Sequence, residues 1–370
     1  MASSFGERLR VSVFGESHGN GIGAVIDGLP AGFPIDFDRL MQFMERRQGG
    51  RNALSTSRKE PDVPRFISGV TDGRTNGFPL CLEIANTNTR SGDYSEMLRK
   101  PRPSHADYTA DVKWHGQADM RGGGHFSGRL TAPLCAAGGI ALQMLKAEGI
   151  LIGAHLWNVG DVFDDPFPMQ PNERLFEQIA QKPFPVIDDA KGEAMMQEIL
   201  SAREAQDSVG GSIECMIDGL RAGIGDPMFD GVENQLARAL FGIPAVKGVE
   251  FGEGFALSQM RGSQANDPFY AVDDVPGLVL TKTNHNGGIL GGITNGMPVR
   301  FRVGIKPTPS IAQPQETVER VGAHMENSVI EIKGRHDPCI AQRAVPVVEA
   351  VAALVTLDLV LTESASAFSF

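Results

Sequence analysis

The chain has 370 residues, of which 41% are hydrophobic and 21% are charged, and its formal net charge is −11. This composition is typical of a soluble globular protein, and the length is sufficient for a large core. The negative charge argues against general nucleic-acid binding, which depends on broad cationic surfaces. We therefore expect no nucleic-acid partner, and any basic ligand site must be local.

The four cysteines are widely spaced and include no C-x-x-C pair, so we predict neither a metal site nor a disulfide framework. They are Cys81, Cys135, Cys215 and Cys339. The longest apolar segment, Ala344–Leu361, contains Glu349 and Asp358, which indicates a core helix rather than a membrane span. The N-terminus has charges where a secretory signal needs an apolar run, so we expect a cytoplasmic protein with no membrane partner.

The first elements are predicted to be a strand, a glycine-rich turn and a helix. Residues Arg10–Phe14 alternate like a strand, and the sequence GESHGNGIG then indicates a turn. Asp36 is placed to cap a helix over Phe37–Arg47.

Three consecutive glycines, Gly122–Gly124, precede a long and almost uncharged apolar segment. Glycine adopts positive φ and lets a ligand approach the backbone, while a helix start offers free N–H groups. The segment Ser127–Lys146 has no polar face, so we predict a helix buried in the core. Ser127, Arg129 and Thr131 favour an anion- or heterocycle-binding turn over the alternative, an ordinary tight turn.

Parts of the first half recur in the second half. Ile26–Gly32 matches Ile217–Gly223 at every position except one, and a T-N-G-x-P sequence precedes both predicted strands Cys81–Ile84 and Arg300–Ile305. A second apolar helix is predicted over Cys339–Leu361. Because the matches are collinear, we predict an internal duplication with a pseudo-twofold axis.

The expected fold class is therefore α/β, an internally duplicated β-α-β sandwich with long apolar central helices between antiparallel sheets. We expect residues 1–370 to form a single intertwined domain, with pseudo-repeat halves at about 10–150 and 208–362. Residues 160–206 are proline-rich at first and predicted to be helical from about Asp188, which indicates a surface insertion.

A cationic cluster lies within residues 46–59 of this acidic chain. The planar guanidinium group suits phosphate and carboxylate, so we predict a small polyanionic ligand. A solvated helix end with cations near its C-terminus is the alternative for the first two arginines. The cluster consists of Arg46, Arg47, Arg51, Arg58 and Lys59.

Three loop histidines, His18, His105 and His336, are candidates for proton transfer, although a lone loop histidine is more often a surface residue. Asp337 is equally explained as a helix N-cap or as a catalytic residue. Lys306–Ser310 could hold a phosphate or form a stiff loop. The chain has neither G-x-G-x-x-G after a strand nor G-x-x-x-x-G-K-[ST], so these nucleotide-binding loops are not supported.

Seven motifs occur in order along nearly the whole chain: GESHG, RPSHADYT, RGGG-x-x-S-x-R-x-TA, AVKGVEFG, NH-x-GGILGG, KPTPSI and GRHDPC. Together they resemble the chorismate synthase family. The resemblance implies a lyase that eliminates phosphate in the anti-1,4 sense from 5-enolpyruvylshikimate 3-phosphate, giving chorismate in the shikimate pathway to aromatic amino acids. It also implies reduced FMN as cofactor, a repeated α/β sandwich and a homotetramer.

The resemblance further implies roles for particular residues. His18 would act near flavin N1, His105 would protonate the departing phosphate, and Asp337 would assist at flavin N5. The implied FMN contacts are His125, Phe126, Ser127, Ala245, Gly291, Lys306, Pro307, Thr308, Pro309, Ser310 and Arg335. The implied contacts to the substrate anions are Arg47, Arg51, Arg129 and Arg335.

The chain departs from the family pattern in the cationic loop and at one predicted flavin contact. Gln48 and Ala53 stand where many relatives carry arginine, and our hypothesis is that Arg51 supplies the missing charge from a shifted position. His125 also stands where arginine is common, which implies a weaker and pH-dependent charge.

Two other functions are alternatives to the lyase: a binding protein for small anions, and a flavin oxidoreductase that consumes NAD(P)H. Whether the chain reduces FMN with NADPH is left open by the sequence. The lack of a dinucleotide fingerprint favours an external flavin reductase as partner.

Overall fold

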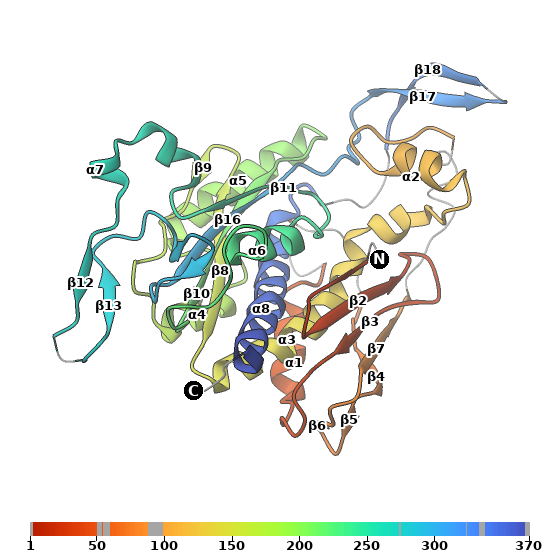
Figure 1. Ribbon diagram of the computed structural model, residues 1–370. Helices are drawn as coiled ribbons and strands as arrows, with labels where there is room; N and C mark the ends of the chain where they lie inside the picture. Colours follow the sequence, from red (N-terminus) through yellow and green to blue (C-terminus); the bar gives the residue numbers. More distant parts are fainter. Residues whose placement is uncertain are drawn as a thin grey trace.

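The computed structural model describes residues 3–49, 54, 60–87, 99–273, 275–322, 324–332 and 337–366. Two antiparallel five-stranded sheets lie on either side of a pair of long helices (Figure 1). The expected mixed α/β architecture with antiparallel sheets is therefore confirmed.

The first sheet is built from the N-terminal part of the chain. Ile22 lies opposite Ile84 on neighbouring strands, and both side chains are buried, so this face of the sheet contributes to the core. In sheet order the strands are β1 (Ser4–Phe5), β2 (Arg10–Gly15), β3 (Gly21–Asp27), β7 (Leu80–Ala85) and β4 (Arg65–Ser68).

The second sheet includes a strand that the sequence did not predict, residues Leu151–Val159. Cys215 at the centre of this sheet lies between Ala154 and Phe301 on its two neighbours, and all three are buried. In sheet order the strands are β11 (Val246–Phe251), β16 (Val299–Ile305), β10 (Gly211–Asp218), β8 (Leu151–Val159) and β9 (Val162–Phe163).

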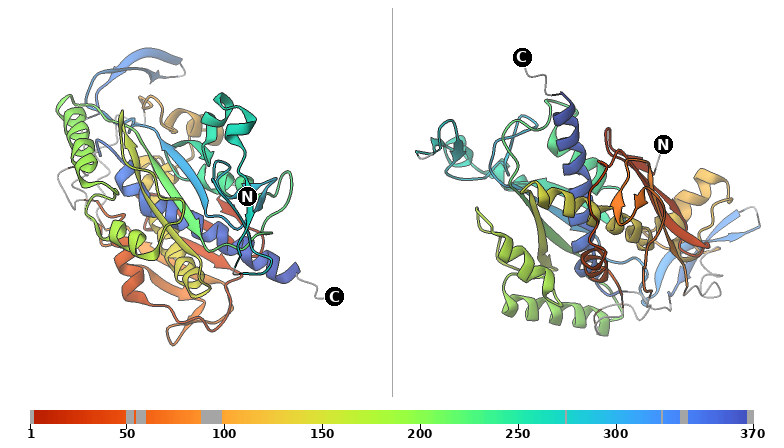
Figure 2. Two further views of the ribbon diagram at one scale, coloured as in Figure 1. Left: turned by 90° about the vertical axis from the view of Figure 1, so that its left-hand side faces the viewer. Right: turned by 90° about the horizontal axis from the view of Figure 1, so that it is seen from below.

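The two apolar helices, α3 (Thr131–Ala147) and α8 (Ala341–Ser366), pack against each other between the sheets (Figure 2). A Cβ atom on Gly138 would overlap Ala350, so the two backbones approach closely. Both helices are long and apolar enough to cross a membrane, yet 78% and 72% of their most apolar windows are buried inside the fold. The prediction of core helices is confirmed.

Two of the shorter helices pack against the central pair, α1 (Phe37–Glu45) against α3 and α6 (Val232–Leu240) against α8. Asp36 caps α1 by accepting a hydrogen bond from the backbone N–H of Arg39, as predicted. Residues 160–206, the predicted surface insertion, contain two helices, of which only the second was predicted. The helices are α1 (Phe37–Glu45), α2 (Asp107–Trp114), α4 (Glu173–Gln181), α5 (Asp189–Glu204), α6 (Val232–Leu240) and α7 (Gly262–Ala265).

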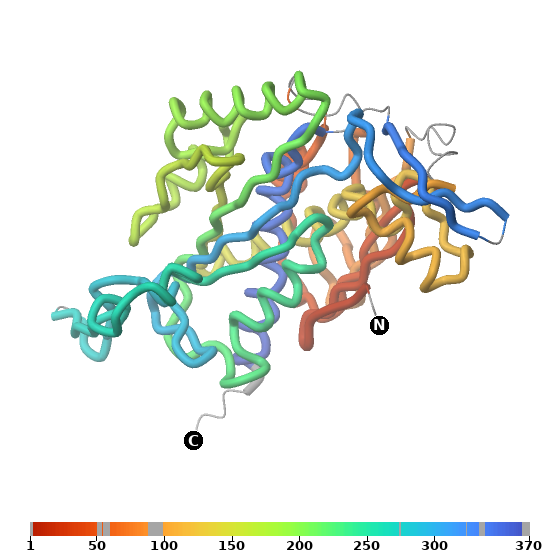
Figure 3. Tube along the Cα trace, turned by 90° about the horizontal axis from the view of Figure 1, so that it is seen from above, coloured from red at the N-terminus to blue at the C-terminus, as the bar shows by residue number. Residues whose placement is uncertain are grey.

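Two hairpins project from opposite ends of the molecule (Figure 3). One consists of β12 (Phe269–Ala271) and β13 (Val279–Thr281), and the other of β17 (Gln315–Val321) and β18 (His324–Ile330). The remaining elements are β5 (Val70–Thr71), β6 (Arg74–Thr75), β14 (Ile289–Leu290), β15 (Ile293–Thr294) and the 3₁₀ turns η2 (Arg121–Phe126), η3 (Gly128–Leu130) and η4 (Gly254–Gln259).

Candidate active site

The glycine run brings two of the predicted histidines together. Gly122, Gly123 and Gly124 have φ angles of 62°, 88° and 54°, which side-chain-bearing residues rarely adopt. A Cβ atom on Gly122 would overlap the ring of His18, and one on Gly123 would lie 3.3 Å from Nε2 of His105. The two histidines thus lie over consecutive glycines, although they come from distant parts of the sequence.

The turn that carries His18 is fixed to its surroundings from two sides. The backbone N–H of Ser17 donates to the carbonyl of Gly124 at 3.1 Å. From the end of β7, the side-chain amide of Asn86 donates to the carbonyls of Glu16 and Gly19 at 3.0 and 2.9 Å. His18 itself is 8% exposed, so this candidate acid or base is shielded from bulk water.

His105 belongs to a charged network at the start of α2. Its Nδ1 lies 2.7 Å from Oδ1 of Asp107, and Arg102 donates to the same carboxylate through Nε and Nη2, each at 2.7 Å. Burial alone would raise the pKa of Asp107, but the hydrogen bonds from Arg102 and His105 outweigh burial and hold this pKa well below its ordinary value. The Asp107 side chain is therefore a carboxylate at neutral pH.

The segment Lys306–Ser310 lies against the His105 loop. Nζ of Lys306 donates to the carbonyl of Ser104, and Nη1 of Arg102 donates to the hydroxyl of Ser310 at 3.3 Å. Burial, followed by the charge of Lys247, lowers the pKa of Lys306. These contacts join the first and second halves of the chain at one place.

Two features of this region favour a ligand site. Oγ1 of Thr308 is buried and has no hydrogen-bond partner among the described residues. Ala245, whose carbonyl accepts from the Lys306 N–H at 3.0 Å, has a φ of 73°, a strained value for a residue with a side chain. An unpaired buried hydroxyl is unfavourable unless a bound group supplies its partner.

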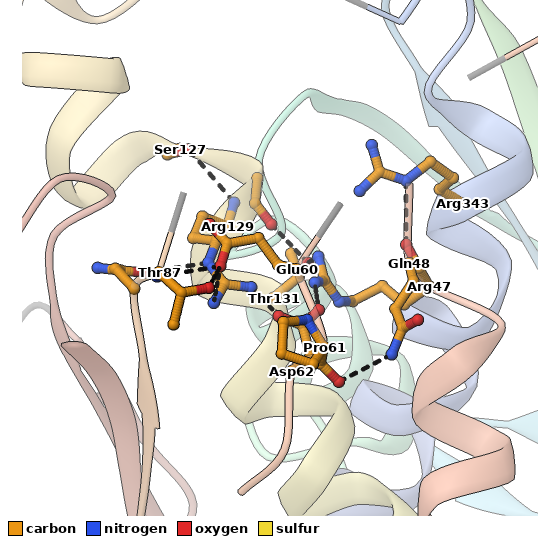
Figure 4. Close-up of polar contacts among 12 residues, drawn as sticks. Arg47, Gln48, Glu60, Pro61, Asp62, Thr87, Ser127, Arg129, Thr131 and Arg343 are labelled. Atoms are coloured by element: carbon orange, nitrogen blue, oxygen red, sulfur yellow. Dashed lines mark hydrogen bonds and ion pairs between the residues drawn. The ribbon is translucent and has the colours of Figure 1, made fainter. Parts of the chain in front are cut away.

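Arg47 and Arg129 form a second cluster with a shared carboxylate (Figure 4). Nη2 of Arg47 and Nη1 of Arg129 donate to opposite oxygens of Asp62, which is 1% exposed. Burial would raise the pKa of Asp62, but the two guanidinium charges outweigh burial and hold the pKa below its ordinary value. Each arginine is thereby fixed in position.

Asn86 connects the arginine cluster to the histidines. Its side-chain oxygen accepts from Nε of Arg129 at 3.1 Å, while its amide holds the His18 turn. Nη2 of Arg129 also lies 3.7 Å from Oε2 of Glu60. The arginine cluster and the histidine pair are therefore neighbouring parts of one site along residues 121–131.

Asp337 joins the same site through an arginine that the sequence analysis did not single out. Nη1 of Arg343 donates to Oδ2 of Asp337 at 2.6 Å, and Nε of Arg343 donates to the carbonyl of Arg47 at 3.0 Å. The helix α8 begins at Ala341, so Asp337 lies too far ahead of it to be its N-cap. The N-cap alternative for Asp337 was wrong.

His125, Phe126 and Ser127 occupy the end of the glycine loop. Nδ1 of His125 donates to the carbonyl of Gly15 at 2.8 Å, and Nε2 accepts from the Ser3 hydroxyl at 2.8 Å, so both ring nitrogens have protein partners. The Phe126 ring is 37% exposed. The Ser127 hydroxyl accepts from the Arg129 N–H at 3.3 Å, which begins the turn η3 and moves the start of α3 to Thr131.

Gly291 is not placed beside the other predicted flavin contacts. It lies in the turn between β14 and β15, and its neighbour Gly292 accepts from the N–H of Val232, the first residue of α6. Ala245 follows the other end of this nine-residue helix, which is about 13 Å long at 1.5 Å per residue. The structure thus separates Gly291 from Ala245.

Some predicted residues lie outside the described part of the chain, and some site residues were not predicted. Those outside it are Arg51, Ala53, Arg58, Lys59, Arg335 and His336. Those not predicted are Asp62, Asn86, Arg102, Asp107 and Arg343. For Arg102 and Asp107 a signal was present, since both flank His105 within the motif RPSHAD.

Known proteins resemble the chain over almost its full length. Residues 9–361 match the family model described as chorismate synthase. The chorismate synthase of Lancefieldella parvula is 44% identical, with 97% of this chain and 96% of that protein covered. That of Thermococcus kodakarensis is 45% identical, with 97% and 98% covered.

A solved structure shows the same architecture. A crystal structure of chorismate synthase superimposes with a TM-score of 0.76 at 27% identity, covering 97% of this chain and 93% of the other. The buried, cation-rich site with two histidines is consistent with chemistry on an anionic substrate. The chain belongs to the chorismate synthase family and is a chorismate-forming lyase of the shikimate pathway.

Proposed function

We propose that this site eliminates phosphate in the anti-1,4 sense from 5-enolpyruvylshikimate 3-phosphate, with reduced FMN as cofactor. The observation that carries the proposal is the position of His18 and His105 over consecutive glycines next to two buried arginines. The substrate has one phosphate and two carboxylates. A buried cationic site can hold these anions, while neighbouring histidines can supply protons.

Each residue has a proposed task. Arg47 and Arg129 bind substrate anions, with Arg51 and Arg335 as further proposed ligands. His105 donates a proton from Nε2 to the departing phosphate, because its Nδ1 is already bonded to Asp107. With FMN bound, His18 would hold a proton on the flavin N1 side, and Asp337, oriented by Arg343, would accept a proton on the flavin N5 side.

The residues present fit a bound flavin nucleotide. The unpaired hydroxyl of Thr308 and the ammonium group of Lys306 suit a phosphate group, and Ser310 lies in the same loop. Gly122 and Gly123, which carry no side chain, let the rings of His18 and His105 lie directly against this loop. Reduced FMN, when bound, supplies electron density that helps the substrate C–O bond break without net oxidation of the substrate.

We also propose the wider organisation that the resemblance implies. The strand order β2-β3-β7-β4 in one sheet and β8-β10-β16-β11 in the other supports an internal duplication. The helices α3 and α8, one from each half, pack against each other. This packing favours a single domain with the insertion 160–206 on its surface. A homotetramer in the cytoplasm, supplied by an external flavin reductase, completes the proposal.

The test is anaerobic phosphate release from 5-enolpyruvylshikimate 3-phosphate with reduced FMN, with oxidised FMN and with none. We expect release together with chorismate absorbance only with reduced FMN, over many turnovers per flavin. Stoichiometric consumption of reductant would instead indicate an oxidoreductase. Separate His18→Ala and His105→Ala variants should bind ligand but lose turnover, whereas His324→Ala on the exposed β18 hairpin should keep it.

A further inference from the structure

We propose that Ser208 is a positioning residue for the segment 306–310, and that it sets the affinity of this segment for the phosphate group of the cofactor. The proposal rests on the proposed function, in which this segment holds that phosphate. Ser208 belongs to the loop between α5 and β10, and its hydroxyl donates to the carbonyl of Thr308 at 2.7 Å. Ser208 thus holds the backbone of the residue whose own buried hydroxyl has no partner among the described residues.

The peptide bond that Ser208 holds has few other means of being fixed. Thr308 is followed by Pro309, so the peptide between them has no N–H and can be held only through its carbonyl. The Ser208 hydroxyl supplies that bond and limits the rotation of this peptide. The Thr308 hydroxyl is thereby kept in place before a ligand arrives, which lowers the ordering cost of binding a phosphate.

The loop also packs against its surroundings through contacts that do not involve the Ser208 side chain. A Cβ atom on Gly210 would lie 3.0 Å from Cδ of Pro307, so the backbone of the loop lies directly against the segment. Beyond the segment, the carbonyl of Gln206 accepts from the N–H of Ala312 at 3.2 Å. Loss of the Ser208 hydroxyl would therefore release one carbonyl but leave the loop in place.

The same loop contacts a second part of the site. The backbone N–H of Val209 donates to the carbonyl of Pro338 at 2.9 Å, next to Asp337. The loop thus joins the proposed phosphate-holding segment to the proposed proton acceptor. Because this second contact is made by a backbone group, a side-chain change at Ser208 leaves it intact, and the effect of such a change is confined to the phosphate side.

The test compares the affinity of the chain for oxidised FMN and for riboflavin, which lacks the phosphate group, by titration calorimetry. We expect Ser208→Ala to weaken FMN binding roughly 3- to 10-fold, within the range of one hydrogen bond, and to leave riboflavin binding unchanged. Riboflavin binding also shows that the variant is folded. Ser208→Thr keeps the hydroxyl and should restore FMN binding. Ser68→Ala, which removes a hydroxyl bond to the Pro79 carbonyl at 2.8 Å on the first sheet, is the matched control and should change neither affinity.

Three results would overturn the proposal: an equal weakening of FMN and riboflavin binding in Ser208→Ala, unchanged FMN binding in this variant, or a wild type that binds both flavins equally well. Thr308→Val gives an independent check, because it removes the hydroxyl that Ser208 positions. Adding Ser208→Ala to this variant should weaken FMN binding little further, and a full further loss would show that Ser208 does not act through Thr308. Failure of the proposed function is distinct, since the wild type would then release no phosphate from the substrate with reduced FMN.

Discussion

At the scale of single residues, Gly122 and Gly123 lie against the two candidate histidines, His18 and His105. His18 and His105 stood out because they lie in loops beside glycine and proline. That Gly122 and Gly123 pack against these two histidines was not predictable, because it depends on how three distant loops meet. Asp62 was missed for the same reason, since its partners Arg47 and Arg129 come from separate elements.

The glycine run gives the sharpest residue-scale prediction. In Gly122→Ala the new methyl group would overlap the His18 ring at a φ of 62°, so we expect His18 to be displaced and turnover to be lost. Gly149→Ala is the matched control, with a φ of 77° and nothing within 4 Å of the new Cβ. The control should lose only about 1–2 kcal/mol of stability, the cost of left-handed backbone. If Gly122→Ala and Gly149→Ala were equally active in the phosphate-release assay, the contact between Gly122 and His18 would be contradicted.

Asp62 gives a second prediction at this scale. Asp62→Asn removes the carboxylate that Arg47 and Arg129 share and leaves Glu60, 3.7 Å from Arg129, as a remaining countercharge, so we expect a loss of about 3–5 kcal/mol in the free energy of unfolding. Added inorganic phosphate should restore more stability to the variant than to wild type, because it replaces the missing anion. Thermal unfolding with and without phosphate measures both effects.

The pH dependence and a control complete the Asp62 test. The pKa of Asp62 is lowered in the folded protein. Its contribution to the free energy of unfolding is therefore present at pH values above its ordinary pKa and is lost as the pH falls through its pKa in the folded protein. The difference between wild type and variant should therefore shrink in acid. Asp189→Asn removes an equal charge from an exposed position and should show neither effect. If phosphate stabilised Asp62→Asn no more than wild type, the role of Asp62 as a countercharge for Arg47 and Arg129 would be contradicted.

At the scale of elements, the long apolar helices were predictable and the strand β8 was not. A helix that is apolar on all sides must be covered on all sides, so α3 and α8 had to lie in the core. The segment Leu151–Val159 is also apolar, but a short apolar run does not distinguish strand from helix. The helix α4 was missed because the prolines before it favoured irregular structure.

The strand β8 carries His155, a buried histidine that leads to an element-scale prediction. Its Nδ1 lies 2.9 Å from Asp164 and its Nε2 3.2 Å from Glu214, which in turn accepts from Arg302 at 3.1 Å. Asp164 also accepts from the backbone of Ile187 and Asp188 ahead of α5, so the cluster holds the insertion on the second sheet. Because both ring nitrogens face carboxylates, the cluster favours the protonated ring.

We expect His155→Gln to lower the free energy of unfolding by about 3–5 kcal/mol at pH 6, since it leaves a buried carboxylate without its cation. Burial would lower the pKa of His155, but the hydrogen bonds to Asp164 and Glu214 outweigh burial and raise the pKa above its ordinary value. The stabilisation by His155 is thus complete at pH values below its ordinary pKa. It is lost as the pH rises through the pKa of His155 in the folded protein. Denaturant unfolding at pH 6 and pH 9 should show a smaller difference at pH 9. His324→Gln on β18 is the control, and an equal difference at both pH values would contradict a charged ring.

At the scale of the whole molecule, the layered plan followed from the sequence but the projecting hairpins did not. The recurrence of the segment Ile26–Gly32 at Ile217–Gly223 pointed to two related sheets, and each copy lies at the end of a central strand, β3 or β10. In the hairpins β12–β13 and β17–β18, apolar and polar residues alternate over only a few positions. Such a short alternation does not distinguish a strand from a loop. Their place at opposite ends depends on the connections between layers, which local sequence does not encode.

The hairpin β12–β13 and the adjoining turn η4 expose large apolar side chains. Phe255 is 82% exposed, Phe269 is 61% exposed and Val279 is 46% exposed. An isolated two-stranded hairpin is marginally stable in water, and exposed apolar groups of this size are typical of association surfaces. We therefore expect this lobe to be covered by another copy of the chain in the proposed homotetramer.

The whole-molecule prediction is that Phe255→Ser combined with Phe269→Ser lowers the assembled mass. Wild type should sediment at the mass of four chains, and the double variant should sediment as smaller species at the same concentration, because each serine removes an apolar contact from the covered face. Phe78→Ser is the matched control, since Phe78 is 71% exposed but belongs to the first half of the chain, away from this lobe. A wild-type protein that sediments as a single chain would contradict the assembly. A double variant that keeps the full mass would place the contact on a different surface and leave the exposed phenylalanines of the lobe without this explanation.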